Sequence, residues 1–259
     1  GIAGFWSIDP VYFAERFRDF LVVISIIYFI YLLFFAGLTA NEKKNVLMLL
    51  LLFIGAAAFW SGFDQSAGSL TIFTRDYVNL TFGTFTAPVS WTQFVNPLFV
   101  VMFAPFFAYL WVFLGKRNLD PNMPIKFGLG LILMALGFIV MILAVKYALA
   151  SSPVGVQWLL LTYLLHTFGE LTLSPVGLSA FSKYSPKRYL GQMMGIWFLA
   201  SSLGGVLAGL LGGEATESGL ESMSPVFTEL VYYCLAIAAV LIVLSFFIKG
   251  AKTDNIPDE

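Results

Sequence analysis

Seven long apolar stretches place the strongest constraint on how this chain folds. They cover about residues 20–38, 46–73, 93–114, 127–149, 157–182, 190–213 and 225–248. A helix needs about 20 mainly apolar residues to cross the ~30 Å hydrocarbon core of a bilayer, and these stretches have that length. Strands of a membrane barrel would instead alternate polar and apolar residues over about 10 positions. The sequence therefore predicts an all-α integral membrane protein with seven spans.

The composition supports this class and excludes others. Of the 259 residues, 59% are hydrophobic and only 11% are charged, and the mean hydropathy is +0.87. A net charge of −1 without a basic block argues against nucleic acid as a partner. The single cysteine, Cys234, excludes an intrachain disulfide, and the single histidine, His166, excludes a histidine-rich metal site. Gly1 is not followed by a charged region and a short apolar stretch, so no cleavable signal peptide is expected.

Sequence motifs for enzyme chemistry are also missing. We find no serine or cysteine nucleophile with a nearby base, and no glycine loop that would hold a phosphate between a strand and a helix. The sequence predicts neither a cofactor nor a bound metal.

Lysine and arginine predict how the spans are oriented, because cytoplasmic loops retain positive charge. The loops between the second and third, fourth and fifth, and sixth and seventh spans lie on one side of the membrane and hold only Arg75 and Lys146. Arg16 and Arg18 also fall on that side, against the rule. Ten cationic residues lie in the other set of loops and at the C-terminus: Lys43, Lys44, Lys116, Arg117, Lys126, Lys183, Lys187, Arg188, Lys249 and Lys252. We therefore expect a cell-membrane protein with these loops and the C-terminus in the cytoplasm and Gly1 outside.

Two carboxylates lie within the predicted spans, Asp64 in the second and Glu170 near the middle of the fifth. A charged group at the bilayer centre costs at least ~2.5 kcal/mol unless it is paired, hydrated or protonated, so such residues are functional candidates. No lysine or arginine of this chain is expected at the same depth. Burial favours the neutral acid and a nearby cation favours the carboxylate, so Glu170 could change protonation when a cationic ligand binds.

Polar residues accompany Glu170 on its predicted helix. His166, Glu170 and Ser174 follow one another at intervals of four, which places them on one face. Asn96 precedes Pro97 in the third span, where a proline weakens the helix. The alternative for His166 is a hydrogen bond within the bundle.

Aromatic residues accompany the two acids. Trp60 shares a helix face with Asp64, Phe63 adjoins them, and Trp197 lies in the glycine-rich sixth span. Aromatic faces beside a carboxylate can hold an ammonium group by ionic and cation–π attraction. The alternative is that each ring packs in the core or faces lipid. The sixth span also contains small-residue pairs, Gly191/Gly195 and Gly205/Gly209, which predict close helix packing.

Four segments together resemble the proton-coupled oligopeptide transporter family of the major facilitator superfamily. They are Phe59–Ser69, Trp91–Phe99, Gly169–Ser179 and Gly191–Leu199, in the family's order and spacing. The resemblance covers roughly residues 46–250. It implies the C-terminal six-helix bundle of a major facilitator fold, preceded by one extra transmembrane helix.

This resemblance divides the chain into an outer segment 1–19, the extra helix 20–40, a cytoplasmic linker 41–45, the bundle 46–250 and a cytoplasmic tail 251–259. It also implies that an N-terminal six-helix half of the same transporter is a partner of this chain, within the lipid bilayer. The transported solutes would be di- and tripeptides, carried with protons by alternating access.

The resemblance assigns roles residue by residue. Glu170 would bind the peptide amino terminus and couple its binding to protonation. Asn96 and Ser174 would bind the polar end of the peptide, and the rings of Trp60, Phe63 and Trp197 would line side-chain pockets. Asp64 would take part in proton coupling together with Glu170. Asp64 and Asp76 would also belong to an outer gate, and Asp64 stands where many relatives have glutamate. Two rivals remain open, a transporter of another solute such as nitrate or a drug, and a non-transporting membrane scaffold.

Overall fold

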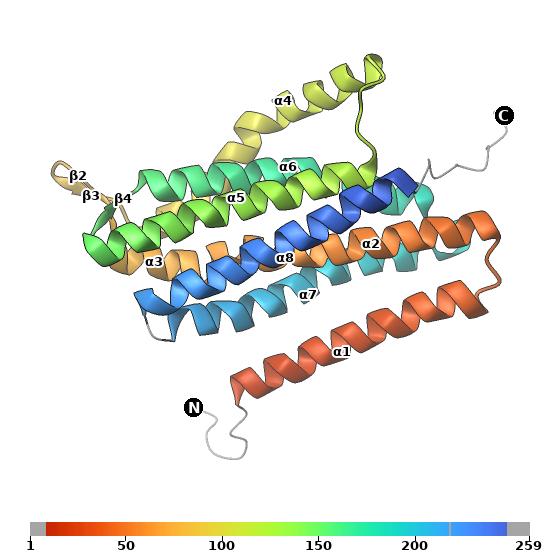
Figure 1. Cartoon of the computed structure of the whole chain (residues 1–259), viewed down its shortest axis with the longest axis horizontal. Coiled ribbons are helices and arrows are strands. Elements are labelled where there is room, and N and C mark those ends of the chain that lie inside the picture. Colours follow the sequence, from red (N-terminus) through yellow and green to blue (C-terminus); the bar gives the residue numbers. More distant parts are fainter. Residues whose placement is uncertain (1–8, 218, 248–259) are drawn as a thin grey trace.

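The computed structural model describes residues 9–217 and 219–247, which form an elongated bundle of helices (Figure 1). The described part does not include the first eight residues, Lys249, Lys252 or the predicted tail 251–259. The helices are α1 Pro10–Ile30, α2 Ala40–Phe63, α3 Ser69–Tyr77, α4 Val95–Lys116, α5 Met123–Ala150, α6 Gln157–Tyr184, α7 Leu190–Thr216 and α8 Leu220–Phe247. A π-helical turn, Tyr31–Phe35, extends α1, and 3-10 turns at Asp64–Ser66, Val89–Phe94 and Lys187–Tyr189 precede α3, α4 and α7. The all-α membrane fold predicted from the sequence is confirmed.

Six helical segments of the described chain are long and apolar enough to cross a membrane, one fewer than predicted. The predicted span that is missing from these six is the fifth, 157–182. It forms the 28-residue α6, which is as long as α5 and α8. Its composition is more polar than that of the other six. Its polar residues Thr162, His166, Thr167 and Thr172 are buried, so the neighbouring helices shield them from lipid.

The first helix begins ten residues earlier than the predicted span 20–38. Asp9 caps α1 by accepting a hydrogen bond from the Val11 backbone N–H at 2.9 Å, and Pro10 occupies the first turn. These local signals start a helix where hydropathy alone does not. A capping box starts α2 in the same way, because the Thr39 hydroxyl and the Glu42 side chain each bond the other's backbone N–H.

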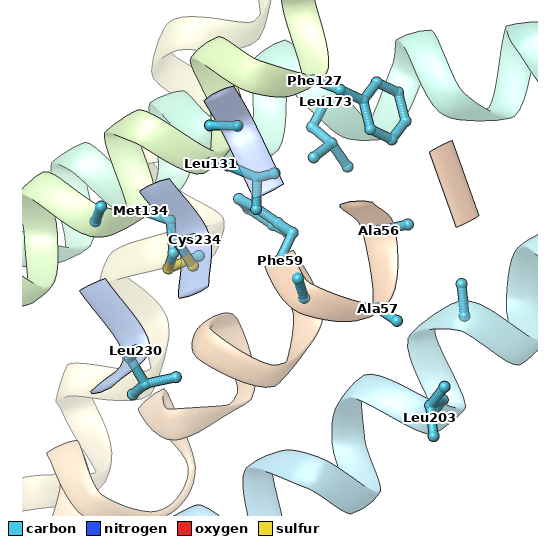
Figure 2. Packing of buried hydrophobic residues seen from close by; sticks show 14 of the residues in the cluster. Ala56, Ala57, Phe59, Phe127, Leu131, Met134, Leu173, Leu203, Leu230 and Cys234 are labelled. Carbon is cyan, nitrogen blue, oxygen red and sulfur yellow. The ribbon is translucent and has the colours of Figure 1, made fainter. Parts of the chain in front are cut away.

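The core lies where α2, α5, α6, α7 and α8 meet. Figure 2 shows Phe59 of α2 among Leu131 and Met134 of α5, with Leu173 of α6 nearby and Leu230 and Cys234 of α8 on the other side. Phe59, Leu131, Met134 and Leu173 are fully buried. This packing fixes α6 against α2 and α5 and so determines which way its polar side chains point.

Glycine brings α2 and α7 into direct contact, but at a different residue from the predicted pairs. A Cβ on Gly204 would lie 2.9 Å from both the Ala57 carbonyl oxygen and the Ser61 backbone nitrogen, so only glycine fits. Gly191, Gly195 and Gly209 have nothing within 4 Å of that position. Within the described residues these three glycines therefore meet no neighbouring helix, because spacing alone does not tell which side of a helix faces a neighbour.

Four two-residue strands lie at the end of the bundle where α3 leads into α4 (Figure 1). β1 Val78–Asn79 pairs in parallel with β4 Val154–Gly155, and β2 Thr81–Phe82 pairs antiparallel with β3 Phe85–Thr86. The first pair ties the loop after α3 to the loop before α6. Together with the turn Val89–Phe94, it sets the start of α4 beside α6.

Candidate functional site

A cavity of about 500 Å³ lies between α2, α6 and α7. It contains four of the residues predicted from the sequence. Eight residues line it: Trp60, Asp64, Ser174, Leu178, Trp197, Phe198, Ser201 and Ser202. Its volume is in the usual range for a site that binds a small molecule. Three helices that are far apart in sequence thus bring the predicted residues together.

Trp197 is held firmly at this cavity and is 95% buried. Its ring packs against Phe181, with centroids 5.4 Å apart, and against Phe127 at 6.4 Å. A Cβ on Gly177 would lie 2.2 Å from Cη2 of the indole, so the absence of a side chain there makes room for the ring. Trp60 lines the same cavity from α2, and its ring contacts that of Phe63 edge to face, with centroids 5.2 Å apart. Phe63 supports the wall but does not itself line the cavity.

Asp64 ends α2 and is half-buried at the cavity. A Cβ on Gly205 would lie 3.2 Å from its Oδ2 atom, so α7 passes close to the carboxylate. Among the described residues Asp64 has neither a hydrogen-bond donor nor an ion-pair partner. The carboxylate is therefore available to a ligand, a proton or a residue outside this chain.

Glu170 lies one turn before Ser174 on α6 and bonds to α4. The Nδ2 atom of Asn96 donates to the Glu170 Oε2 atom at 3.0 Å and to the Thr167 hydroxyl at 3.0 Å. Thr167 in turn donates to the Tyr163 carbonyl oxygen at 2.7 Å. Asn96 thereby joins the start of α4 to α6 and orients the Glu170 carboxyl group. No ion pair to Glu170 exists in the part of the chain that the structure describes.

His166 does not share the polar face predicted for it. Its side chain is 99% buried and packs on α5, with its ring 4.9 Å from that of Phe138. A Cβ on Gly137 would lie 2.4 Å from His166 Nε2. By strict hydrogen-bond geometry neither ring nitrogen has a partner among the described residues, and the polar group that comes nearest is the Met134 backbone on α5. His166 packs on α5 and does not line the cavity, so it is a packing residue here.

Asp76 lies apart from the cavity, at the end of α3. Its carboxylate accepts hydrogen bonds from Arg75 at 2.6 and 2.8 Å, and both side chains are exposed. The structure therefore does not bring Asp76 together with Asp64.

The sequence analysis did not select four lining residues, Leu178, Phe198, Ser201 and Ser202. Two of them, Leu178 and Ser201, could have been found from helical spacing. Leu178 follows Ser174 by four residues and Ser201 follows Trp197 by four, so each pair lies on one face. Thr167, the second acceptor of Asn96, precedes Glu170 by three. Within the described ranges, no three histidine, cysteine, aspartate or glutamate residues are close enough to hold a metal ion.

Comparison with known proteins decides the family. Residues 9–221 match the model of the POT family. The chain belongs to this family. The POT resemblance predicted from the four motifs is therefore confirmed.

Its curated relatives are membrane transporters. Over 93% of its length the chain is 37% identical to the peptide transporter YePEPT of Yersinia enterocolitica, and it covers 48% of that protein. It is also 37% identical to the uncharacterized transporter YclF of Bacillus subtilis, with 92% and 48% of the two chains aligned. A di-/tripeptide transporter of Lactococcus lactis is 34% identical, with 78% and 42% aligned.

Solved POT structures share the fold. The crystal structure of the peptide transporter POT in complex with sulfate has a TM-score of 0.85 and 31% identity, covering 93% of this chain and 48% of that one. A POT family transporter in complex with 5-aminolevulinic acid has a TM-score of 0.84 and 28% identity, with 94% and 50% covered. The chain spans about half the length of the relatives it matches.

Proposed function

We propose that this chain is the C-terminal half of a proton-coupled symporter that carries di- and tripeptides by alternating access. The observation that supports it best is the cavity of about 500 Å³, which joins two tryptophans, three serines and Asp64, a carboxylate without a partner among the described residues. Glu170 lies one turn from the lining residue Ser174 on α6. The peptide-transporter names of several relatives support the same substrate class. Binding near the midplane between two repeats is the usual arrangement in such transporters.

The proposed roles follow from charge and position. Glu170 is protonated when the site is empty and ionises to bind the peptide ammonium group. For proton and peptide to move in the same direction, the proton that Glu170 gives up passes to another acid of the transporter, and Asp64 is the candidate for this role in this chain. Asn96 already donates to Glu170 at 3.0 Å and so positions the carboxyl group in both states. Ser174 binds a polar group of the peptide from the cavity wall. Trp60 and Trp197 contact peptide side chains, and Phe63 holds Trp60 in place.

An N-terminal half would complete the site. Asp64 is a gate residue in this proposal and has no partner in the described part of the chain, so a cation from the other half is its expected partner. Asp76 would have to exchange Arg75 for such a partner, because the two are already paired. Helix α4 offers a surface for this half, since only 6% of the most apolar stretch of segment Val89–Lys116 is buried.

The orientation is part of the proposal. Lys43, Lys116, Lys126 and Lys187 lie at the ends of helices that meet at one end of the bundle, while Arg75 ends α3 at the other. The positive-inside rule then places the lysine-rich end in the cytoplasm of a cell with this transporter in its plasma membrane.

Transport by the full-length protein in liposomes tests the proposal. An inward proton gradient should drive uptake of labelled dialanine. Glu170→Gln should abolish the effect of the gradient while dipeptide counterflow continues, because glutamine still binds but cannot release a proton. Glu217→Gln, which changes an exposed glutamate at the end of α7, should leave uptake unchanged.

Three results distinguish the rivals. Uptake that ignores the gradient would reject symport. Gradient-driven uptake of nitrate or a drug without peptide uptake would favour a transporter of another solute. If the protein transports none of these solutes, and Glu170→Gln leaves its assembly with other proteins unchanged, the scaffold hypothesis would be favoured.

A further inference from the structure

The long span that begins with α2 is interrupted at Asp64. Helix α2 ends at Phe63, the 3-10 turn Asp64–Ser66 follows, and α3 begins at Ser69. The Ala67 backbone N–H donates to the Asp64 carbonyl oxygen at 3.1 Å, three residues back rather than four. An irregular stretch inside a membrane span needs protein around it, because lipid cannot satisfy its polar groups. The neighbours of this turn therefore determine where the Asp64 carboxyl group lies.

Gln65, the next residue, fills the space between this turn and α7. Its side chain is fully buried. The Nε2 atom donates to the Ala208 carbonyl oxygen of α7 at 3.0 Å, and the Oε1 atom accepts from the Ser69 hydroxyl at 2.7 Å. A longer contact of 3.5 Å joins Nε2 to the Ser61 carbonyl oxygen of α2. One amide group thus joins the helices on either side of the break to α7.

Helix α7 has the shape to receive the turn. A Cβ on Gly212 would lie 3.3 Å from the Gln65 Oε1 atom, and one on Gly205 would lie 3.2 Å from the Asp64 Oδ2 atom. Gly205, Ala208 and Gly212 follow one another at intervals of three and four, so they lie on one face of α7. Asp64 and Gln65 therefore both contact this face.

The other end of the turn is held separately. The Ser66 carbonyl oxygen accepts hydrogen bonds from the Gln93 Nε2 atom at 3.0 Å and from the Thr71 hydroxyl at 2.7 Å. Gln93 belongs to the 3-10 turn that precedes α4. The Asp64 carboxyl group has no donor among the described residues, so these contacts of its neighbours fix its position. Of these contacts, the Gln65 amide is the one that reaches α7, which forms a wall of the candidate cavity.

We propose that Gln65 is a positioning residue that fastens the Asp64 turn to α7 and so holds the Asp64 carboxyl group at the candidate cavity. In the proposed function this carboxyl group takes up the proton that Glu170 releases. The part of Gln65 in proton transfer rests on that function, whereas the placement of the turn does not. Without the amide group, the turn remains attached through Ser66 but can separate from α7.

Thiol labelling of the full-length protein in detergent tests the placement. Asp64→Cys puts a thiol at this position. The native Cys234 is buried, and any accessible cysteine of the other half is first changed to serine. Gln65→Met keeps nearly the same side-chain length and removes the hydrogen bond to α7. A water-soluble methanethiosulfonate reaches the thiol when the turn separates from α7, so labelling should become about fivefold faster, the expected effect of one lost hydrogen bond on that equilibrium.

Two variants control this measurement. Gln65→Glu can make the same hydrogen bonds as the neutral acid and should keep the original labelling rate. Gln192→Met is the matched exchange near the start of α7, away from the turn. Gln192 also bonds between helices, since the Tyr28 hydroxyl donates to its Oε1 atom at 2.9 Å. Its replacement should leave the labelling rate unchanged.

Dipeptide transport in liposomes tests the consequence. In the protein that retains Asp64, Gln65→Met should lower gradient-driven uptake about fivefold while dipeptide counterflow continues, because only proton transfer needs the fixed carboxyl group. A merely structural role of Gln65 would lower both rates alike.

The two assays separate the possible failures. Labelling that changes by less than about twofold with Gln65→Met would overturn the proposal. Faster labelling in a protein whose uptake ignores the proton gradient would keep Gln65 as the anchor of the turn and reject proton symport instead. If Asp64→Cys does not fold, the ratio of gradient-driven uptake to counterflow decides, and a ratio that Gln65→Met leaves unchanged refutes the role of Gln65.

Discussion

Gly177 offers the sharpest test of how the candidate site is built. Its missing side chain leaves room for the Trp197 indole, which lines the candidate cavity. A Cβ at this position would lie 2.2 and 2.4 Å from two atoms of the ring, against ~3.5 Å for ordinary contact. The Gly177→Ala change therefore requires a shift of at least about 1.3 Å by the indole or by α6 and α7.

The expected cost follows from this overlap. Overpacking costs about 1–3 kcal/mol, and the gain in helix propensity from glycine to alanine returns about 1 kcal/mol. Gly177→Ala should thus destabilise the protein by up to about 2 kcal/mol. Gly195→Ala on α7 is the matched control, because nothing lies within 4 Å of its new Cβ, and it should be neutral or stabilising.

The assay is heat unfolding of the full-length protein in detergent, together with dipeptide uptake in liposomes. Gly177→Ala should lower the apparent Tm and reduce uptake, since a displacement of about 1 Å at a binding group can cost 100-fold in rate. Trp197→Phe removes the colliding ring atoms and should restore part of the Tm in the double variant. Only part returns, because Phe127 lies 2.9 Å from the same Cβ. An equal loss of Tm with and without the indole would refute the assignment of the clash to Trp197.

Three further variants test other contacts. Gly137→Ala should lower the apparent Tm through overpacking of about 1–3 kcal/mol against His166, and His166→Ala in the same chain should relieve it. Asn96→Ala removes the donor to Glu170 and should reduce gradient-driven uptake about tenfold or more, while Asn96→Gln should restore part of it. Thr39→Ala breaks the capping box of α2 and should destabilise by about 1 kcal/mol without changing the peptide affinity measured by counterflow.

The sequence predicted most of the fold because hydropathy dominates in a membrane chain. It predicted the cavity less completely. His166, Glu170 and Ser174 follow one another at intervals of four, but each interval overshoots a full turn by about 40°, so the first and last differ by about 80°. In the structure His166 packs on α5, Glu170 bonds to α4, and Ser174 faces the cavity. Which neighbour each one meets depends on packing that spacing does not contain.

The same limit applies to glycine. Gly204 contacts α2 and Gly177 receives Trp197, although neither belongs to the small-residue pairs read from the sequence. The need for a missing Cβ comes from the tertiary neighbour. The start of α1 at Pro10 is a different case. Asp9 and Pro10 are a local helix-start signal in the sequence, but a hydropathy profile does not detect it.

The polar character of α6 has a consequence for how the protein enters the membrane. A carboxylate and a buried histidine on one span make its partitioning into lipid as a single helix unfavourable, because an acid at the centre costs ~2.5–3.5 kcal/mol during insertion. Helix α5 precedes it through a loop of only six residues, has a hydropathy of 2.8 in its most apolar stretch, and packs along it. We expect the two to leave the translocon as one hairpin, so that assembly of the binding site begins before the chain is complete.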